Sequence, residues 1–171
     1  MMLRTFIELI RDRRGNAAAE MAMVTPLLLI LMLGCAELGN YFWNEHTLLK
    51  AVRDGARFAA RQSFNYYGCS GSPDTTNVVT PTQNVVMYGY LSGTDALTPN
   101  IVRTNVTVTQ SCTTTAGGQT MQGLYRNDAN GAHVVAVAAT VTYRPVIAVA
   151  LGFSGVGYQL YAQSQAAVTG L

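Results

Sequence analysis

One carboxylate, that of Glu20, lies where a long apolar stretch begins, shortly after the arginine-rich segment Arg11–Arg14. The stretch itself, Met21–Ala36, contains no charged residue. An acid at membrane depth costs about 2.5–3.5 kcal/mol on insertion scales, so such residues usually have a partner. Cleavage after Gly15 would create an α-amino group at Asn16, one helical turn from Glu20. If the chain were cleaved there, Glu20 would find its counter-ion in the new amino group of its own or a neighbouring subunit.

Two cysteines lie outside the apolar stretch, in polar segments typical of loops. Cys69 and Cys112 could pair in an oxidising compartment, and two free thiols are the alternative. Closing a loop of this length would contribute about 4 kcal/mol by chain entropy. The third cysteine, Cys35, lies within the apolar stretch, where we interpret it as a small hydrophobic residue.

Catalytic, metal-binding and nucleic-acid-binding patterns are absent from the sequence. The only histidines are His46 and His133, with no cysteine or histidine spacing for zinc, no nucleophile elbow and no phosphate loop. The net charge of +2 comes with only 12% charged residues, and the arginines form no patch interleaved with stacking aromatics. We therefore expect no enzyme, no cofactor, no metal and no nucleic-acid partner.

The element that must carry Glu20 is a membrane-spanning helix. Met21–Ala36 would extend about 24 Å as a helix, slightly less than a hydrocarbon core of about 30 Å. Extension from Ala17 to the aromatic residues Tyr41–Trp43 gives ample length and places aromatic rings at the interface. The arginines before the stretch predict a cytoplasmic N-terminus. Pro26 removes one helical hydrogen bond, which neighbouring helices in a bundle can cover; a buried helix of a soluble protein is the alternative.

Beyond the membrane the helix should continue to about Arg61. From Leu38 onward, apolar residues recur at spacings of three and four, with charged residues largely on other faces. The small pairs Gly55-Ala56 and Ala59-Ala60 would allow close approach, either by the chain's own sheet or by another subunit's helix.

The rest of the chain predicts a small β-rich domain. Ser63–Gln83 is rich in Ser, Thr, Asn, Gly and Pro and is interpreted as a loop. Strand patterns follow at Val85–Leu91, Ile101–Thr109, His133–Tyr143 and Tyr158–Ala166. We therefore expect an α+β fold: a long N-terminal transmembrane and amphipathic helix, followed by a small antiparallel sheet packed on its outer half.

The N-terminal third of the chain resembles the TadE-like pseudopilins of tight-adherence (Flp) pilus systems. Their pattern is Arg-Gly, small residues, Glu, an apolar run with an early Pro, Gly-x-x-Glu and Ala-x-x-x-Gly-Ala-Arg. The chain carries these features as Arg14-Gly15, Ala17–Ala19, Glu20, Pro26, Gly34 with Glu37, and Ala51 with Gly55, Ala56 and Arg57. Val85–Gly89, Asn105–Val108 and Thr140–Pro145 are similar to weaker distal signatures of the family.

The resemblance implies a pilin-like subunit in four parts. These are a cytoplasmic prepilin leader (1–15), a transmembrane helix (16–43), an amphipathic extension (44–62) and a periplasmic or extracellular β-rich head (63–171). It implies a minor pilin that a prepilin peptidase cleaves after Gly15, and that assembles through its apolar helix with other pilins and inner-membrane assembly machinery. Pro26, Gly34 and Glu37 would then contact neighbouring helices.

Two other interpretations of the same residues stay open. Lipoprotein processing at Cys35 would require Glu20 and Pro26 inside the discarded apolar core, which makes a poor signal segment. An uncleaved, membrane-tethered periplasmic binding module would instead use the β domain to hold a ligand or an envelope polymer.

Overall fold

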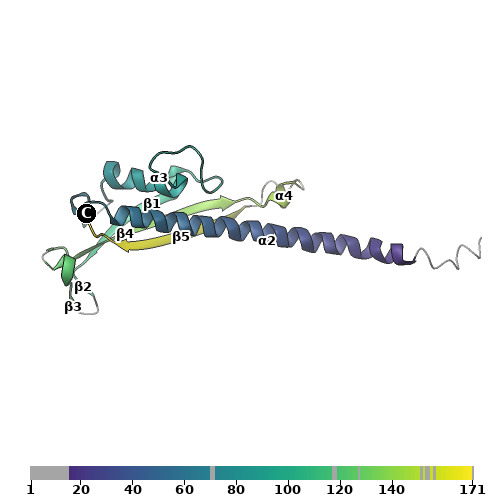
Figure 1. Cartoon of the computed structure of the whole chain (residues 1–171), viewed down its shortest axis with the longest axis horizontal. Coiled ribbons are helices and arrows are strands. Elements are labelled where there is room, and N and C mark those ends of the chain that lie inside the picture. The colour runs from purple at the N-terminus through teal and green to yellow at the C-terminus, as the bar shows by residue number, and fades with distance from the viewer. Residues whose placement is uncertain are drawn as a thin grey trace, which may run out of the picture. The chain divides into compact units, whose positions relative to one another are not determined.

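The computed structural model describes residues 16–69, 72–116, 119–126, 128–150, 152, 155 and 157–170. Its longest element is helix α2, Asn16–Ala60 (Figure 1). Ala, Leu and Met, which are strong helix formers, dominate its first half, and the helix continues past Pro26. The chain divides into two units, of which the first ends at Asn40 and the second comprises Tyr41–Leu171. The expected long helix is confirmed.

A three-stranded antiparallel sheet forms the centre of the second unit (Figure 1). Its strands are β1 (Val106–Thr113), β4 (Ala132–Tyr143) and β5 (Tyr158–Ala167), with β4 in the middle. Val and Ala dominate β4, and side chains on alternate positions of the strand are buried. The antiparallel sheet that the Val- and Thr-rich patterns predicted is therefore confirmed, although β1 begins five residues and ends four residues later than expected.

One face of this sheet packs on the outer part of α2 to form the core. The fully buried residues of the helix recur at helical spacing, and those of the strands alternate. They include Leu48, Val52, Ala56 and Ala59 of the helix, and Val135, Val137, Val141, Leu160 and Ala162 of the sheet. Ala56 and Ala59 of α2 therefore serve close packing within the chain's own domain.

The expected strand at Val85–Leu91 is wrong. Its first residues belong to helix α3, Thr80–Tyr88, which lies beside β1 and contributes Val86 and Met87 to the core. A proline in the first turn and Gly89, in the left-handed conformation at the C-terminus, delimit the helix. A short apolar run cannot be distinguished from a buried helix segment by periodicity alone, which explains the error.

The expected loop at Ser63–Gln83 also contains regular structure. It holds the 3-10 turn η2 (Phe64–Tyr66), the π-helical turn η3 (Thr75–Val79) and the start of α3. Asp74 caps η3, because its carboxylate accepts a hydrogen bond from the backbone N–H of Asn77 at 2.7 Å. Side-chain capping therefore gives regular structure to a segment whose composition favoured a loop.

Short elements complete the second unit. They are the 3-10 turns η4 (Arg103–Asn105) and η5 (Gly123–Tyr125), the hairpin of β2 (Thr115–Ala116) and β3 (Gln119–Thr120), and helix α4 (Val146–Ala150). After β5, the backbone N–H of Thr169 donates to the carbonyl of Ala60 at 2.8 Å. This bond satisfies one of the carbonyls that a helix C-terminus leaves without an intrahelical partner.

Candidate functional site

The apolar side chains at the start of α2 point outward on all sides. Of the described residues, α2 is the one helix long and apolar enough to cross a membrane, and its most apolar window buries nothing. The exposed large side chains are Met21, Met23, Val24, Leu27, Leu28, Leu29, Ile30, Leu31, Met32 and Leu33. A helix that is apolar all round needs an apolar environment, which lipid or other helices can supply.

Glu20 lies exposed at the beginning of this apolar surface. Among the described residues no cation forms a salt bridge with it. Asn16 is the first described residue of α2, and four residues at about 1.5 Å each place its backbone about 6 Å along the axis from Glu20. Gly15, the other half of the expected processing site, lies outside the described residues.

The three expected contact residues are spread along the same helix. Pro26 lies inside α2, where its missing N–H leaves the carbonyl of Ala22 without the usual partner. Gly34 leaves the helix surface open, since a Cβ added there would meet no atom within 4 Å. Glu37 is half-buried. Because Glu20 and Glu37 lie about 25 Å apart along the axis, the fold does not gather these residues into one site.

A groove of about 490 Å³ lies between the outer part of α2 and the end of α3. Trp43 and Lys50 line one side, and Tyr88, Tyr90 and Leu97 line the other. Trp43 is 75% exposed and Tyr90 is 73% exposed. Aromatic surface and a cation are available there to a partner, and the sequence analysis did not predict this groove.

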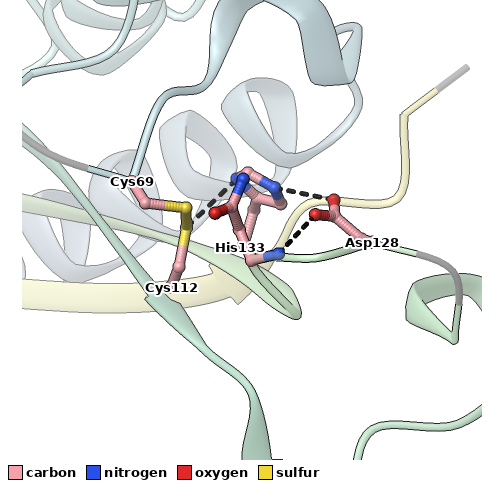
Figure 2. The surroundings of a disulfide bond; sticks show 5 residues. Cys69, Cys112, Asp128 and His133 are labelled. Carbon is pink, nitrogen blue, oxygen red and sulfur yellow. Dashed lines mark hydrogen bonds and ion pairs between the residues drawn. A yellow bond between two sulfur atoms is a disulfide. The ribbon is translucent and has the colours of Figure 1, made fainter.

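Cys69 and Cys112 form a disulfide, with their Cα atoms 5.3 Å apart (Figure 2). Cys112 is on β1, and Cys69 follows the 3-10 turn η2. Of the described cysteines, Cys35 is the free one, and it is exposed on α2. The sequence analysis left this pairing open against two free thiols. The bond ties the segment after α2 to the sheet.

A histidine and a carboxylate extend this disulfide into a cluster (Figure 2). Sγ of Cys112 lies 3.3 Å from Nδ1 of His133, and Nε2 of His133 lies 2.9 Å from Oδ2 of Asp128. His133 is only 4% exposed. The antiparallel register of β1 and β4 places Cys112 directly opposite His133.

The turn before β4 positions Asp128. Its Oδ1 accepts a hydrogen bond from the backbone N–H of Asn130 at 2.8 Å. This bond is the main reason that the pKa of Asp128 lies below its ordinary value, and the neighbouring His133 lowers the pKa further. Gly131 has φ +75° and lies so close to β1 that a Cβ there would meet the carbonyl oxygen of Thr113 at 2.1 Å. The turn therefore requires glycine at this position.

The residues joined in this cluster include types that can bind a metal ion. Ligand atoms of Cys69, Cys112 and His133 all lie within 4.8 Å of one another. Thiolates bind metals, but both sulfurs are here joined in a disulfide, so a metal would require prior reduction. The sequence analysis missed this cluster because no short motif connects residues 69, 112 and 133.

Comparison with protein families gives a match over residues 15–57, to the family described as TadE-like protein. The matched segment is about a quarter of the chain. Comparisons with curated proteins and with solved structures give no match. The matched segment begins at Gly15 and includes Glu20, Pro26, the exposed apolar surface and Gly55. Residues 15–57 therefore match the TadE-like family, which confirms the resemblance that the N-terminal motifs indicated.

Proposed function

We propose that this protein is a minor pilin or pseudopilin of a Flp/Tad-type pilus, and that it assembles through its apolar N-terminal helix. One observation carries the proposal: the TadE-like segment includes the first half of α2, where the large apolar side chains from Met21 to Leu33 are exposed. An exposed apolar helix can lie in a membrane and can pack against similar helices in a fibre. Its role is structural, and it has no catalytic part.

In this proposal a prepilin peptidase removes residues 1–15 by cleavage after Gly15. Residues 16–43 then cross the inner membrane, residues 44–62 extend the helix, and residues 63–171 form a head on the periplasmic side. The arginines before the helix support the orientation, since positively charged short segments stay in the cytoplasm. The partners are other pilins of the system and its inner-membrane assembly machinery.

Glu20 would supply the electrostatic part of assembly. In an apolar bundle a lone carboxylate is costly, and a cation a few ångströms away offsets that cost. The α-amino group that cleavage creates at Asn16 is such a cation. Glu20 of one subunit and the N-terminus of the next can therefore pair when their helices are in register.

Pro26, Gly34 and Glu37 are proposed as helix contacts in the assembled state. Gly34 supports this role because its open surface lets a neighbouring backbone approach closely. The carbonyl that Pro26 leaves without a helical partner can accept a hydrogen bond from a neighbour.

The deciding experiment is N-terminal sequencing of the protein co-expressed with the prepilin peptidase of its own system. We expect a mature chain that starts at Asn16. A chain that still starts at Met1 would contradict the proposed processing. Gly15→Val should block cleavage, whereas Gly39→Ala, a glycine change at another open position of the helix, should leave cleavage unchanged.

A second experiment tests Glu20. Glu20→Ala should insert into the membrane normally, because the change makes the helix more apolar, but should reduce pilus assembly at least tenfold. Glu45→Ala, which removes an acid from α2 outside the apolar stretch, is the control. Normal piliation in Glu20→Ala would rule out the counter-ion role.

The groove beside Trp43 favours a second candidate function, that of an uncleaved, membrane-tethered binding module. The two functions differ in processing and in the effect of groove mutations. A binding module keeps its N-terminal residues and loses function in Trp43→Ala, whereas a pilin is processed and depends on Glu20.

A further inference from the structure

The disulfide, His133 and Asp128 form a line of contacts that resembles a thiol, a base and a carboxylate that orients the base (Figure 2). Nδ1 of His133 faces Sγ of Cys112 at 3.3 Å, and Nε2 faces Oδ2 of Asp128 at 2.9 Å. The ring is held from a third side by Phe64, whose centroid lies 5.9 Å from that of His133 in an edge arrangement. The imidazole therefore has a defined orientation toward one of the two sulfurs.

The hydrogen-bond partners determine which ring nitrogen carries the proton. An ionised carboxylate only accepts hydrogen bonds, so Nε2 of His133 donates to Asp128. In the neutral imidazole this leaves the lone pair of Nδ1 directed at Cys112. Nδ1 can therefore take a proton from a thiol at Cys112, or as imidazolium can stabilise a thiolate there.

The two sulfurs differ in their surroundings. Cys69 is exposed, whereas Cys112 is half-buried on β1 and has the imidazole beside it. An external thiolate can reach Cys69 more easily. Exchange is faster when the leaving sulfur is stabilised as a thiolate, and His133 beside Cys112 can do this as an imidazolium.

We propose that the Cys69–Cys112 bond is an exchangeable disulfide, opened and closed by a partner protein that carries a dithiol or disulfide centre. The partner's sulfur bonds to Cys69, and His133 exchanges a proton with the sulfur of Cys112. This inference goes beyond the proposed assembly role and does not depend on it.

Opening takes two steps. A thiolate of the partner attacks Sγ of Cys69, the Sγ–Sγ bond breaks, and its electron pair goes to Cys112, which leaves as a thiolate. The imidazolium form of His133 then gives its Nδ1 proton to this thiolate, and the imidazole becomes neutral. The partner's second thiolate then attacks the partner sulfur of the mixed disulfide and releases Cys69 as a thiolate. The partner is thereby oxidised from dithiol to disulfide, and this chain gains two electrons. The two protons that the partner's thiols released to solvent are taken up from solvent by the Cys69 thiolate and by Nδ1 of His133.

Closing is the reverse reaction with an oxidised partner. Cys69 as a thiolate attacks one sulfur of the partner's disulfide, the partner's S–S bond breaks, and its other sulfur leaves as a thiolate. A mixed disulfide then joins Cys69 to the partner. Nδ1 of His133 then takes the proton of the Cys112 thiol, and the resulting thiolate attacks Cys69 and expels the partner's thiolate. His133 acts on Cys112 in both directions, while Asp128 is a positioning residue that keeps Nδ1 directed at the sulfur.

The first test identifies the sulfur attacked in the full-length, unmutated chain in detergent. The oxidised protein is treated with reduced glutathione under a metal chelator, quenched with an alkylating agent and digested for mass spectrometry. We expect glutathione on Cys69 and the alkyl group on Cys112. Glutathione mainly on Cys112, or equally on both cysteines, would overturn the proposal.

The second test measures the rate of reduction by dithiothreitol in variants. His133→Gln should lower the rate about tenfold, because the departing thiolate loses its partner. His46→Gln removes the chain's other histidine and should leave the rate unchanged. A rate for His133→Gln within twofold of the unmutated chain would overturn the role of the imidazole. If His133→Gln does not fold, as shown by a lost thermal transition, the first test decides alone.

The third test measures whether Asp128 acts on Cys112 through His133. In the Cys69→Ser chain, the far-ultraviolet absorbance of the Cys112 thiolate should decrease when Asp128→Asn is added. Asp95→Asn, a matched change at an exposed position, should leave the absorbance unchanged. Equal thiolate absorbance with and without Asp128→Asn would show that the carboxylate does not act through His133.

Discussion

The two units of this chain use apolar residues in opposite ways. In the first unit, the large side chains between Met21 and Leu33 are exposed, and Met23 is 81% exposed. In the second unit, Val52 of α2 and Val135 and Val137 of β4 are completely buried in the core between helix and sheet. The second unit therefore has an internal source of stability in its core. The apolar surface of the first unit needs an environment from outside the chain, either lipid or other helices.

The glycines of α2 show the same contrast at single positions. A Cβ at Gly34 would meet no atom within 4 Å, whereas a Cβ at Gly55 would meet Cγ2 of Val86 at 2.4 Å. Gly55 therefore allows α3 to pack against α2 inside the head. Among the described residues Gly34 has no such neighbour, so its small size leaves the helix surface open at this position.

The largest expected effect comes from placing a charge in each region. Val52→Asp puts a carboxylate in the core without a partner and should destabilise the head by about 4 kcal/mol or more, enough to remove its cooperative unfolding. Val24→Asp should leave that thermal transition in detergent unchanged, because Val24 is exposed. Circular dichroism during heating measures both.

Val24→Asp should act on membrane insertion instead. A carboxylate within the apolar stretch costs about 2.5–3.5 kcal/mol on insertion scales, so less protein should reach the membrane fraction. If Val24→Asp lowered the melting temperature of the head as much as Val52→Asp, the contrast between the two regions would be wrong.

Removal of the disulfide should have the next largest effect, and only on the head. The double variant Cys69→Ser/Cys112→Ser opens a loop that spans 43 positions. The chain-entropy model gives a loss of stability of about 4 kcal/mol for such a loop, and typical measured losses are about 2–4 kcal/mol. Thermal unfolding with and without a reductant measures the effect. Alkylation of both cysteines in the unreduced protein would contradict the prediction, and Cys35→Ser is the control for loss of a thiol outside the bond.

Alanine at the two helix glycines should sharpen the contrast further. Gly55→Ala gains helix propensity of about 1 kcal/mol but forces Val86 away, and we expect a net loss of about 1–2 kcal/mol in the free energy of unfolding. Gly34→Ala should not destabilise the head at all. Denaturant unfolding of the two variants in parallel measures the difference, and equal unfolding free energies would contradict it.

The smallest expected effect is the pH dependence that Asp128 confers on the head. Its folded-state pKa is lowered, mainly by the N–H of Asn130, so its contribution to stability is present above the ordinary value of 3.8. That contribution is lost as the pH falls below 3.8 through the lowered pKa. Asp128→Asn should therefore flatten the acid limb of a stability curve measured by urea unfolding. Because Asp128 is solvent-accessible, the effect should be small, and an unchanged acid limb would contradict it.

Local sequence patterns predicted much of the fold. The length and outward face of α2 follow from its continuous apolar composition, and β4 and β5 follow from alternating Val, Ala, Thr and Gln. Val85–Leu91 was expected to be a strand because a short apolar and aromatic run favours one. Burial of Val86 and Met87 against the core overrides that preference and makes them helical.

The candidate sites also differ in how far the sequence alone could predict them. Glu20 and Pro26 were identified from neighbouring residues in the sequence, and both lie on helix α2. The processing site after Gly15 stays a prediction. The contact between Cys112 and His133 could not be predicted from the sequence. The two residues lie 21 positions apart, and only the register of β1 and β4 brings them together.

The sequence by itself determined that an apolar helix with one early acid precedes a small β-rich domain, because hydrophobic periodicity is a property of neighbouring residues. Only the tertiary structure decided which side chains meet across the domain. Gly55 lies against Val86, and His133 lies between Cys112 and Asp128. Such contacts depend on the packing and register of segments distant in the chain, which no local pattern encodes.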